Sequence, residues 1–462
     1  MESSKVQSFF QDIRSRELNG FRVRKRPYPD NDLSKSSEIG ALAVEHDGND
    51  TPPMAISFCK TSKNSHILSV ANEDGYISLF NSRFKFPSLS THHENTDKAR
   101  ICEWLAHDNS IFDVCWIKED TRILTASGDQ SIKTWDVQRE VCVALLMGHT
   151  GSVKSICSHP TNSDCILSGS RDGSFALWDL RCSAGRNEKG LVTSHAVVKE
   201  AHISPHLKRV RRGKAASMSI TSVLFLKDEI SIATAGAVDS VVKFWDMRNL
   251  KGPVIQACPN FDSSNEKERG ISSLSQDLNG VFMSASCRDN RIYLYNVLQL
   301  EKGPIKSFSG CRIDTFFVKS ALSPDAAHLL GGSSDGNAYI WQVNKPEMEP
   351  VVLKGHDAEV TAVDWSLSEV GKIATSSDDF TVRLWNIENS CYSNTRSPSS
   401  IRRRVMPPST KCRKLFADEA TAVEICSRNS PDKVQHPMYS PTTITVSDVG
   451  TPSPKGEKPQ LV

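Results

Sequence analysis

Three histidines in this chain each stand 22 or 23 residues before an aspartate, with serines or threonines between them. The pairs are His107 with Asp129, His149 with Asp172, and His356 with Asp379. Histidine, a hydroxyl and aspartate could form a nucleophilic triad, and histidine with carboxylates could hold a metal ion. Because the set recurs along the chain, a structural hydrogen-bonded chain is the better interpretation. We therefore expect no enzyme activity, no metal and no cofactor.

Short strands must position these residues. Seven times, an acidic residue is followed six positions later by an aromatic one, with alternating apolar residues between them. The pairs recur every 43 to 67 residues and are Asp74/Phe80, Asp129/Trp135, Asp172/Trp178, Asp239/Trp245, Asp289/Tyr295, Asp335/Trp341 and Asp379/Trp385. A motif repeated at such intervals predicts an all-β, seven-bladed propeller, in which each aromatic is buried against a neighbouring blade.

The histidine sets resemble the WD repeat, which has a Gly-His pair, a turn aspartate and a closing Trp-Asp. The resemblance implies that His, a strand hydroxyl, Asp and Trp form a buried hydrogen-bonded chain in each blade. The tryptophans would be Trp135, Trp178 and Trp385. The hydroxyl would be Ser168 or Ser170 for His149, and Thr375 or Ser377 for His356. His202 is a less regular fourth histidine.

The propeller is expected to span residues 51–390, after an N-terminal flank, 1–50. No convincing fourth strand follows Asn386, so the flank should supply it near Phe21–Val23 or Ala41–Val44, because ring closure removes an exposed edge. Between blades three and four, residues of about 182–218 are expected to form a basic loop insertion that includes His206–Lys214.

Residues 391–462 are rich in Ser, Thr and Pro and poor in large apolar side chains, so this tail is predicted to be disordered. Its candidate phosphorylation sites precede proline: Ser397, Ser430, Ser440, Thr451 and Ser453. Basic clusters could act as nuclear-import signals or be solvated charge: Arg24, Lys25 and Arg26, and Arg402, Arg403 and Arg404. The nucleus is the expected location of the protein.

Composition excludes several classes of protein. No run of 18 apolar residues could span a bilayer, and the first 20 residues lack the apolar stretch of a secretory signal. The 13 cysteines form no CxxC pair, which favours reduced cysteines such as Cys115, Cys157, Cys165 and Cys287 in the core. The tail from Cys391 carries 11 Lys and Arg against 6 Asp and Glu, which leaves the rest near −3. We expect no sequence-specific nucleic-acid binding by the propeller.

Two of the closing motifs carry an arginine two residues beyond the aspartate: Trp178-Asp179-Leu180-Arg181 and Trp245-Asp246-Met247-Arg248. They resemble the WDxR boxes by which propeller receptors dock on the damaged-DNA-binding adaptor of cullin-4 ubiquitin ligases. Small residues precede the first turn in 166–172 and, less well, the second in 232–239. The alternative is that each arginine pairs locally with acidic neighbours.

Longer segments are similar to one family, the denticleless proteins, which are substrate receptors of cullin-4 RING ligases. The segments are 70–81, 104–116, 125–137, 234–248 and 316–325, and they include the one-residue insertion in Ala-Gly-Ala-Val-Asp that ends at Asp239. The resemblance implies a non-catalytic nuclear receptor, active in S phase and after DNA damage. Its substrates would carry a degron bound to the replication sliding clamp: a licensing factor, a cyclin-kinase inhibitor and a histone H4 methyltransferase.

The chain departs from that family at the clamp-binding box of animal members. The nearest match is Gln435 with Met438, but Pro441 and Thr442 occupy the aromatic positions, so recognition is expected to rest on the propeller. Because the family's degrons carry basic residues, an acidic patch is expected on the propeller face. Two alternatives remain open: a scaffold or histone-binding propeller without a ligase role, and a catalytic propeller, for which no acid or metal constellation is visible.

Overall fold

The computed structural model describes residues 36–87, 90–183, 190–202, 219–259, 269–369 and 371–387. All of them lie in one compact unit, Met1–Ser397. They form strands and loops, with one short helix, α2 (His92–Ala99), and one 3₁₀ segment, η2 (Val297–Lys302). No helix in these ranges is long and apolar enough to cross a membrane.

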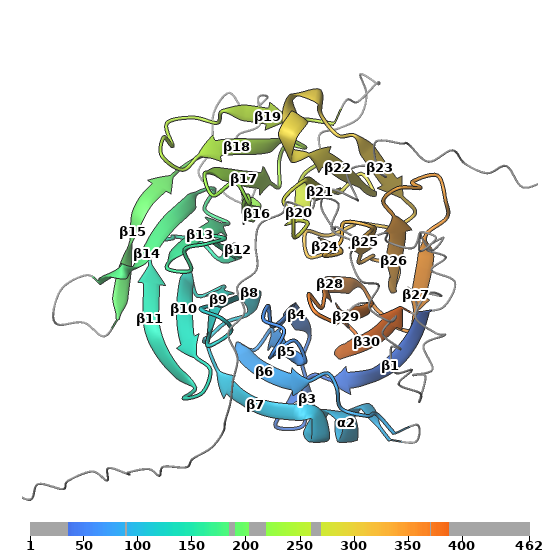
Figure 1. Ribbon diagram of the computed structural model, residues 1–462. Helices are drawn as coiled ribbons and strands as arrows, with labels where there is room; N and C mark the ends of the chain where they lie inside the picture. The colour runs from blue at the N-terminus through green and yellow to red at the C-terminus, as the bar shows by residue number, and fades with distance from the viewer. Residues whose placement is uncertain are drawn as a thin grey trace, which may run out of the picture. The chain divides into compact units, whose positions relative to one another are not determined.

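Seven four-stranded antiparallel blades are arranged in a ring (Figure 1). Blade one contains β4 (Pro53–Phe58), β5 (Ile67–Asn72), β6 (Tyr76–Asn81) and β7 (Arg100–Leu105). Blade two contains β8 (Ile111–Ile117), β9 (Arg122–Ser127), β10 (Ser131–Asp136) and β11 (Val141–Met147). Blade three contains β12 (Val153–Ser158), β13 (Cys165–Ser170), β14 (Phe175–Ser183) and β15 (Leu191–Val198).

The remaining blades follow in chain order. Blade four contains β16 (Ile220–Phe225), β17 (Ser231–Gly236), β18 (Val242–Asp246) and β19 (Ile255–Ala257). Blade five contains β20 (Ile271–Gln276), β21 (Phe282–Cys287), β22 (Arg291–Asn296) and β23 (Lys306–Ser309). Blade six contains β24 (Ser320–Leu322), β25 (His328–Gly331), β26 (Asn337–Gln342) and β27 (Val351–Lys354). Blade seven contains β28 (Val360–Trp365), β29 (Lys372–Ser377), β30 (Thr381–Ile387) and β1 (Ser36–Ala43). The predicted all-β, seven-bladed propeller is confirmed.

The outer strand of blade seven comes from the N-terminal flank. β1 pairs antiparallel with β30 from Ser36–Ile387 to Ala43–Thr381, and Arg383 forms an ion pair of 2.7 Å with Glu38. β1 therefore contains most of the Ala41–Val44 segment that the sequence suggested, while Phe21–Val23 lies outside the described residues. A small hairpin, β2 (Glu45–His46) and β3 (Asn49–Asp50), then leads into blade one.

The expected insertion at 182–218 needs correction. Residues 191–198 are not an insertion but β15, the outer strand of blade three, in which Val192, Ala196 and Val198 fall on one side of the strand. β15 also pairs in parallel with β11 at Leu145–Leu191 and Leu146–Val192, which joins blades two and three into one eight-stranded sheet. The basic segment 206–214 lies outside the described residues.

Side chains on the inner strands join each blade to the next. Asp113 accepts from the Ile156 amide at 2.9 Å, Ser155 from Val223 at 3.2 Å, Ser222 from Leu274 at 3.0 Å, Ser273 from Ser320 at 3.0 Å, and Asp364 from Phe58 at 2.7 Å. Two indoles complete the ring: Trp116 donates to the Ser57 carbonyl at 3.1 Å, and Trp365 to the Ala321 carbonyl at 3.0 Å. Every pair of neighbouring blades is thus linked by a hydrogen bond.

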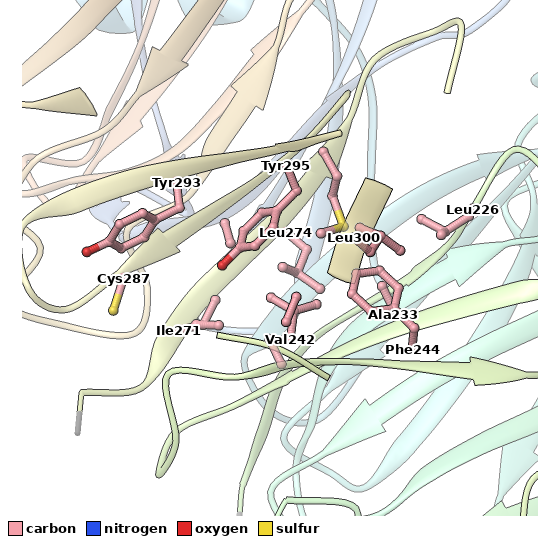
Figure 2. Close-up of a cluster of buried hydrophobic side chains, with 14 residues drawn as sticks. Leu226, Ala233, Val242, Phe244, Ile271, Leu274, Cys287, Tyr293, Tyr295 and Leu300 are labelled. Atoms are coloured by element: carbon pink, nitrogen blue, oxygen red, sulfur yellow. The ribbon is translucent and has the colours of Figure 1, made fainter. Parts of the chain in front are cut away.

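Apolar clusters fill the spaces between blades. Figure 2 shows one of them, where Phe244 and Val242 of blade four face Leu274, Tyr295 and Ile271 of blade five. All seven aromatic residues of the repeated pairs are buried, with exposed fractions of 8% or less. Burying this apolar surface is the main favourable term in folding, and each blade depends on its neighbour for it.

Four blades contain a complete hydrogen-bonded chain, called a tetrad below. In blade three, His149 bonds Ser168 at 2.7 Å and Asp172 at 3.2 Å, and Trp178 donates to Ser168 at 2.8 Å. The other tetrads are His107, Thr125, Asp129 and Trp135; His202, Thr234, Asp239 and Trp245; and His356, Thr375, Asp379 and Trp385. A neutral histidine that donates from Nδ1 and accepts at Nε2 satisfies every group in the chain.

Blades five and six replace the histidine by a tyrosine four residues after the turn aspartate. The Tyr293 hydroxyl donates to Asp289 at 2.5 Å, and the Tyr339 hydroxyl donates to Asp335 at 2.6 Å. In each of these blades the carboxylate still has a donor from the third strand. The role of the turn aspartate therefore extends beyond the blades with histidine.

We expect Ser168→Ala to lower the free energy of unfolding by about 2–4 kcal/mol, because it leaves the His149 ring and the Trp178 N–H without their buried partner. Urea denaturation of the purified chain measures this loss. Ser307→Ala, an exposed serine on β23, is the matched control and should be neutral. Equal stability of the two variants would contradict the role given to the tetrad.

The tetrads also predict how stability depends on pH. Burial raises the pKa of Asp129, but hydrogen bonds and charge from His107, with hydrogen bonds from Ser131, bring it down to about 2. The pKa of Asp172 and that of Asp379 are lowered in the same way by His149 and His356 against the effect of burial. Stability from such a group is present above the unfolded pKa, near 3.9, and is lost as pH falls toward the folded value.

We therefore expect stability to fall between about pH 4 and pH 2. Asp379→Asn should reduce stability at pH 7 and make the acid-induced loss shallower, since one linked proton is removed. Urea titrations at pH 7, 4 and 3 provide the comparison, with Asp47→Asn, a largely exposed residue, as the control. An unchanged slope in Asp379→Asn would be evidence against this linkage.

Candidate functional site

The two WDxR motifs lie at the same end of adjacent blades. This end, where the third strand of each blade finishes beyond the aromatic residue of its repeated pair, is called the WD face. The opposite end carries the seven turn aspartates and is called the turn face. Trp178 and Trp245 are buried tetrad members, so they hold the blade and are not available to a partner. Only the residues that follow them reach the surface.

Both arginines pair with the aspartate of their own motif. Arg181 donates from Nε and from an Nη to the two Asp179 oxygens at 2.9 and 2.7 Å, and Arg248 does the same to Asp246 at 2.9 and 2.7 Å. The backbone amide of each arginine also donates to that carboxylate, at 3.0 and 2.9 Å. This is the local pairing that the sequence left open as an alternative, and it is built identically in both blades.

Local pairing leaves each guanidinium oriented and accessible. The side chains of Arg181 and Arg248 remain 65% and 69% exposed. Hydrogen bonds from the arginines lower the pKa of Asp179 and that of Asp246 to about 2, so both carboxylates are charged at neutral pH. An arginine has five N–H donors, and the aspartate engages two of its side-chain N–H groups. The others remain free for an acceptor on another molecule.

Glycines before the two turns allow close packing, between blades three and four at the first turn and within blade four at the second. A Cβ on Gly169 would lie 2.6 Å from Ile220 Cγ2 in blade four, and one on Gly236 would lie 2.8 Å from His202 Cβ. The small residues of these motifs are therefore explained by packing. The extra residue in Ala-Gly-Ala-Val-Asp is accommodated in the turn, because Thr234 and Asp239 still join the same tetrad.

Exposed apolar side chains occur on the WD-face loops of blade four, which carries Arg248, and of blade five. They are Ile230, Val254, Leu278, Val281 and Leu298. Ile230 directly precedes β17, and its carbonyl accepts the amide of Met247, inside the second motif. β19, which Val254 precedes, contacts η2, which contains Leu298. An oriented arginine beside apolar side chains is a composition typical of protein interfaces.

The turn face carries an acidic group at blades one, six and seven: Glu73, Glu359 and Asp378. Burial raises the pKa of Asp378, and the nearby charges of Glu359, Glu73 and Asp379 raise it further. Glu359 accepts hydrogen bonds from Ser334 and from Thr315, the latter at 3.0 Å. Acidic residues thus converge on part of this face, and cations line another part of it.

The other predicted residues divide into two groups. His202, the least regular histidine, forms a complete tetrad; its 37-residue separation from Asp239 hid the pattern, although Thr234 and Trp245 signalled it. Tyr293 and Tyr339 were missed, and their spacing of four from the turn aspartate was the available signal. The candidate phosphorylation sites and nuclear-import clusters lie outside the described residues.

Carboxylates in the central channel are engaged in structure. Asp113 bonds the Ile156 amide and Lys319, and Asp364 bonds the amides of Phe58 and Trp365. Burial raises the pKa of Asp364 to about 7 against those bonds. Among the described residues, one cluster has metal-ligand spacing, Glu45, Asp50 and His93, and it lies on the surface.

Cysteines in the described ranges form no disulfide, and several pack as apolar side chains. Cys115 and Cys287 are buried within core clusters, and Cys157 and Cys165 pack against another. Burial raises the pKa of Cys287 to about 12. These thiols are therefore poorly suited to nucleophilic chemistry.

Comparison with known proteins agrees with this geometry. The family "WD domain, G-beta repeat" matches residues 99–136, 140–179 and 349–386. The "Denticleless protein homolog" of Gallus gallus is 37% identical over 77% of this chain and 50% of its own length. That of Danio rerio is 33% identical over 95% of this chain and 66% of its own length. The chain belongs to the denticleless-type WD-repeat proteins.

The Drosophila "Protein lethal(2)denticleless" is a more distant member, 33% identical over 74% of this chain and 45% of its own length. The chain spans about half the length of several of the curated relatives it matches. For this denticleless-type protein, the similarity and the propeller agree on the fold.

Proposed function

We propose that this protein is the substrate-recognition subunit of a cullin-4 RING ubiquitin ligase. The observation that carries the proposal is the pair of identically built arginine forks at Arg181 and Arg248, on one face of adjacent blades. Membership of the denticleless family supports it, because the resemblance to that family implies a substrate receptor of cullin-4 RING ligases. The damaged-DNA-binding adaptor would dock on the WD face.

Docking would be favoured because each motif arginine side chain is already held in one conformation and loses little conformational entropy on binding. Asp179 and Asp246 hold the guanidinium groups in place before a partner arrives, which reduces the entropy lost on association. The exposed apolar residues near Arg248, such as Val254 and Leu298, would contribute burial of apolar area. A charged anchor with an apolar surround is the arrangement expected of an interface hot spot.

The turn face would receive substrates, because it lies opposite the adaptor. Basic residues in the degron of a clamp-bound substrate would pair with Glu73, Glu359 and Asp378. Substrates of the proposed ligase are a licensing factor, a cyclin-kinase inhibitor and a histone H4 methyltransferase, degraded in S phase and after DNA damage in the nucleus. The protein would act by proximity, since the ligase core brings the conjugating enzyme to the bound substrate.

A second candidate is a histone- or chromatin-binding scaffold without a ligase role. The same acidic group, Glu73, Glu359 and Asp378, favours it, because histone tails are also basic. This candidate predicts that no ubiquitin machinery accompanies the protein, so recovery of the adaptor separates the two.

We expect the double variant Arg181→Ala, Arg248→Ala to lose the adaptor and the cullin in affinity purification of the tagged full chain from cells. Both side chains are largely exposed, and their hydrogen bonds to described residues lie within their own motif, so the fold should be unaffected. Thermal unfolding of the purified variant, with an unchanged midpoint, establishes that the propeller is intact.

The matched control is Arg139→Ala. Arg139 is exposed on the equivalent turn of blade two, where its amide bonds Asp136, but it stands one residue later than the motif arginines. Adaptor recovery should be unchanged in this variant. Full recovery of the adaptor by the folded double variant would exclude the assignment of the two motifs.

We expect Glu73→Gln with Asp378→Asn to weaken binding of a clamp-bound degron peptide by about tenfold or more, since two charges facing a basic ligand are removed. Fluorescence anisotropy with a labelled degron peptide and purified clamp measures the affinity. Because the pKa of Asp378 is raised, wild-type binding should also weaken as pH falls, when this carboxyl gains a proton.

Glu347→Gln removes an exposed acid from the β26–β27 loop on the WD face and serves as the control. It should bind the degron peptide as the wild type does. An affinity that is the same for the wild type and the double acid variant would place degron recognition elsewhere.

A further inference from the structure

A cavity of about 430 Å³ opens at the turn-face mouth of the central channel. Its wall includes four cations, Lys154, Arg171, Arg288 and Lys319, and three phenyl rings, Phe112, Phe316 and Phe317. They come from blades two, three, five and six and from the loop before β24. The cavity lies beside the acidic group, since Thr315 lines it and also bonds Glu359 at 3.0 Å.

The positive charge of this cavity is not balanced by its own residues. Lys319 is paired with Asp113 at 3.1 Å, outside the cavity wall. The one carboxylate in the wall, Asp314, is paired with Arg312 at 2.8 Å. Within the described ranges, neither the Lys154 ammonium nor the Arg171 guanidinium has a hydrogen bond or ion pair, and Arg288 bonds only backbone oxygen. Three cations therefore face the cavity without an anion.

The aromatic rings hold two of these cations in place. Lys154 Nζ lies 3.1 Å from the Phe112 ring centre and 5.2 Å from that of Phe317, and these two rings are stacked 6.1 Å apart. The Arg288 guanidinium lies 4.6 Å from the Phe316 ring. Ring faces that already contact the protein's own cations do not form a cage for an incoming cation. The arrangement instead presents fixed positive charge to an anion.

Two further observations favour an anionic ligand in this cavity. Among the residues that the structure describes, Arg288 Nε is buried without a hydrogen-bond partner, which is unfavourable for a charged donor. Burial, with the charges of Arg171 and Lys319, lowers the pKa of Lys154 to about 8. An anion in the cavity would accept hydrogen bonds from the unpaired donors. It would also offset the mutual repulsion of the cations.

We propose that this cavity binds the phosphate of a phosphorylated Ser/Thr-Pro peptide. A phosphomonoester is close to doubly charged at neutral pH and has three acceptor oxygens, which matches the unpaired donors of Lys154, Arg171 and Arg288. Phe317, 40% exposed at the mouth, offers a ring face to the proline that follows. A recess of this size suits one side chain, and the near-neutral charge of the chain outside its tail does not provide the extended basic stripe of a nucleic-acid site.

Such a peptide has two possible sources that share one chemistry. The chain itself contains Ser/Thr-Pro steps at Ser397, Ser430, Ser440, Thr451 and Ser453. Another protein could equally supply the phosphopeptide. The site is independent of the adaptor-docking motifs, which lie on the opposite face.

The test uses the full chain after phosphatase treatment and a fluorescein-labelled peptide of residues 426–437 phosphorylated at Ser430. We expect anisotropy to report binding at least about tenfold tighter than to the unphosphorylated peptide, and Arg171→Ala and Lys154→Met each to weaken it by about tenfold. Arg171 is exposed, so its removal leaves the core intact. Arg139→Ala on the WD face is the matched control and should bind normally.

Equal affinity for the two peptides, or unchanged affinity in both cavity variants, would overturn the proposal. The proposal would also be overturned if a single-stranded DNA oligonucleotide displaced the peptide, bound more tightly than the peptide, and lost affinity in the same two variants. Phosphorylating the full chain with a proline-directed kinase distinguishes the two sources of the phosphopeptide. Lowered affinity for added peptide indicates the chain's own sites, and unchanged affinity indicates another protein. Either result is consistent with a phosphate site in the cavity. Adaptor recovery by Arg171→Ala should be normal, so failure here is distinct from failure of the ligase proposal.

Discussion

Closure of the ring is the constraint on which the rest of this structure depends. β30 would be an open edge of blade seven, and residues 36–43 fill that edge as β1. Once blade seven is complete, its inner strand can contact blade one, where Asp364 accepts the Phe58 amide at 2.7 Å. The circle of inter-blade hydrogen bonds and apolar clusters is then uninterrupted. Residues far apart in sequence, such as Lys154 and Lys319, come to the same channel only because the circle closes.

The closed ring separates two kinds of surface. The turn aspartates lie at one end of the blades, and the residues that follow the Trp-Asp pairs lie at the other. Trp178 and Trp245 belong to the scaffold, while Arg181 and Arg248, three residues beyond them, belong to the surface. This division lets one face carry oriented arginines beside apolar side chains while the opposite face carries an acidic group and a cationic cavity. The proposed receptor would use this separation, with the ligase on one side and the substrate on the other.

The periodic part of the fold could be predicted from the sequence because it depends on local patterns. The turn aspartate and the aromatic six residues later are fixed by strand geometry, and a histidine 22 or 23 residues earlier is fixed by blade length. His202 was harder to recognise because residues between blades lengthen its spacing. β15 was missed because the interval between blades three and four is long, and the whole stretch was assigned to an insertion.

Features that depend on contacts between blades could not be predicted. The cavity gathers residues from positions 54 to 319, and no short-range pattern connects them. The sequence identified Arg181 and Arg248 and left their pairing open; the bidentate bonds to Asp179 and Asp246 depend on side-chain geometry at the strand ends. The residues of the expected acidic patch could not be named from the sequence, because the charge of a face depends on which loops converge there.

In the proposed complex, the WD face of blades three and four holds the adaptor while the turn face stays open to substrate. Hydrogen–deuterium exchange of the full chain, measured with and without purified adaptor, can detect this arrangement. We expect slower exchange around residues 179–183 and 246–256, with residues 312–319 and 355–359 unchanged. Protection confined to the turn-face segments, or absent from the segments that follow Trp178 and Trp245, would contradict it.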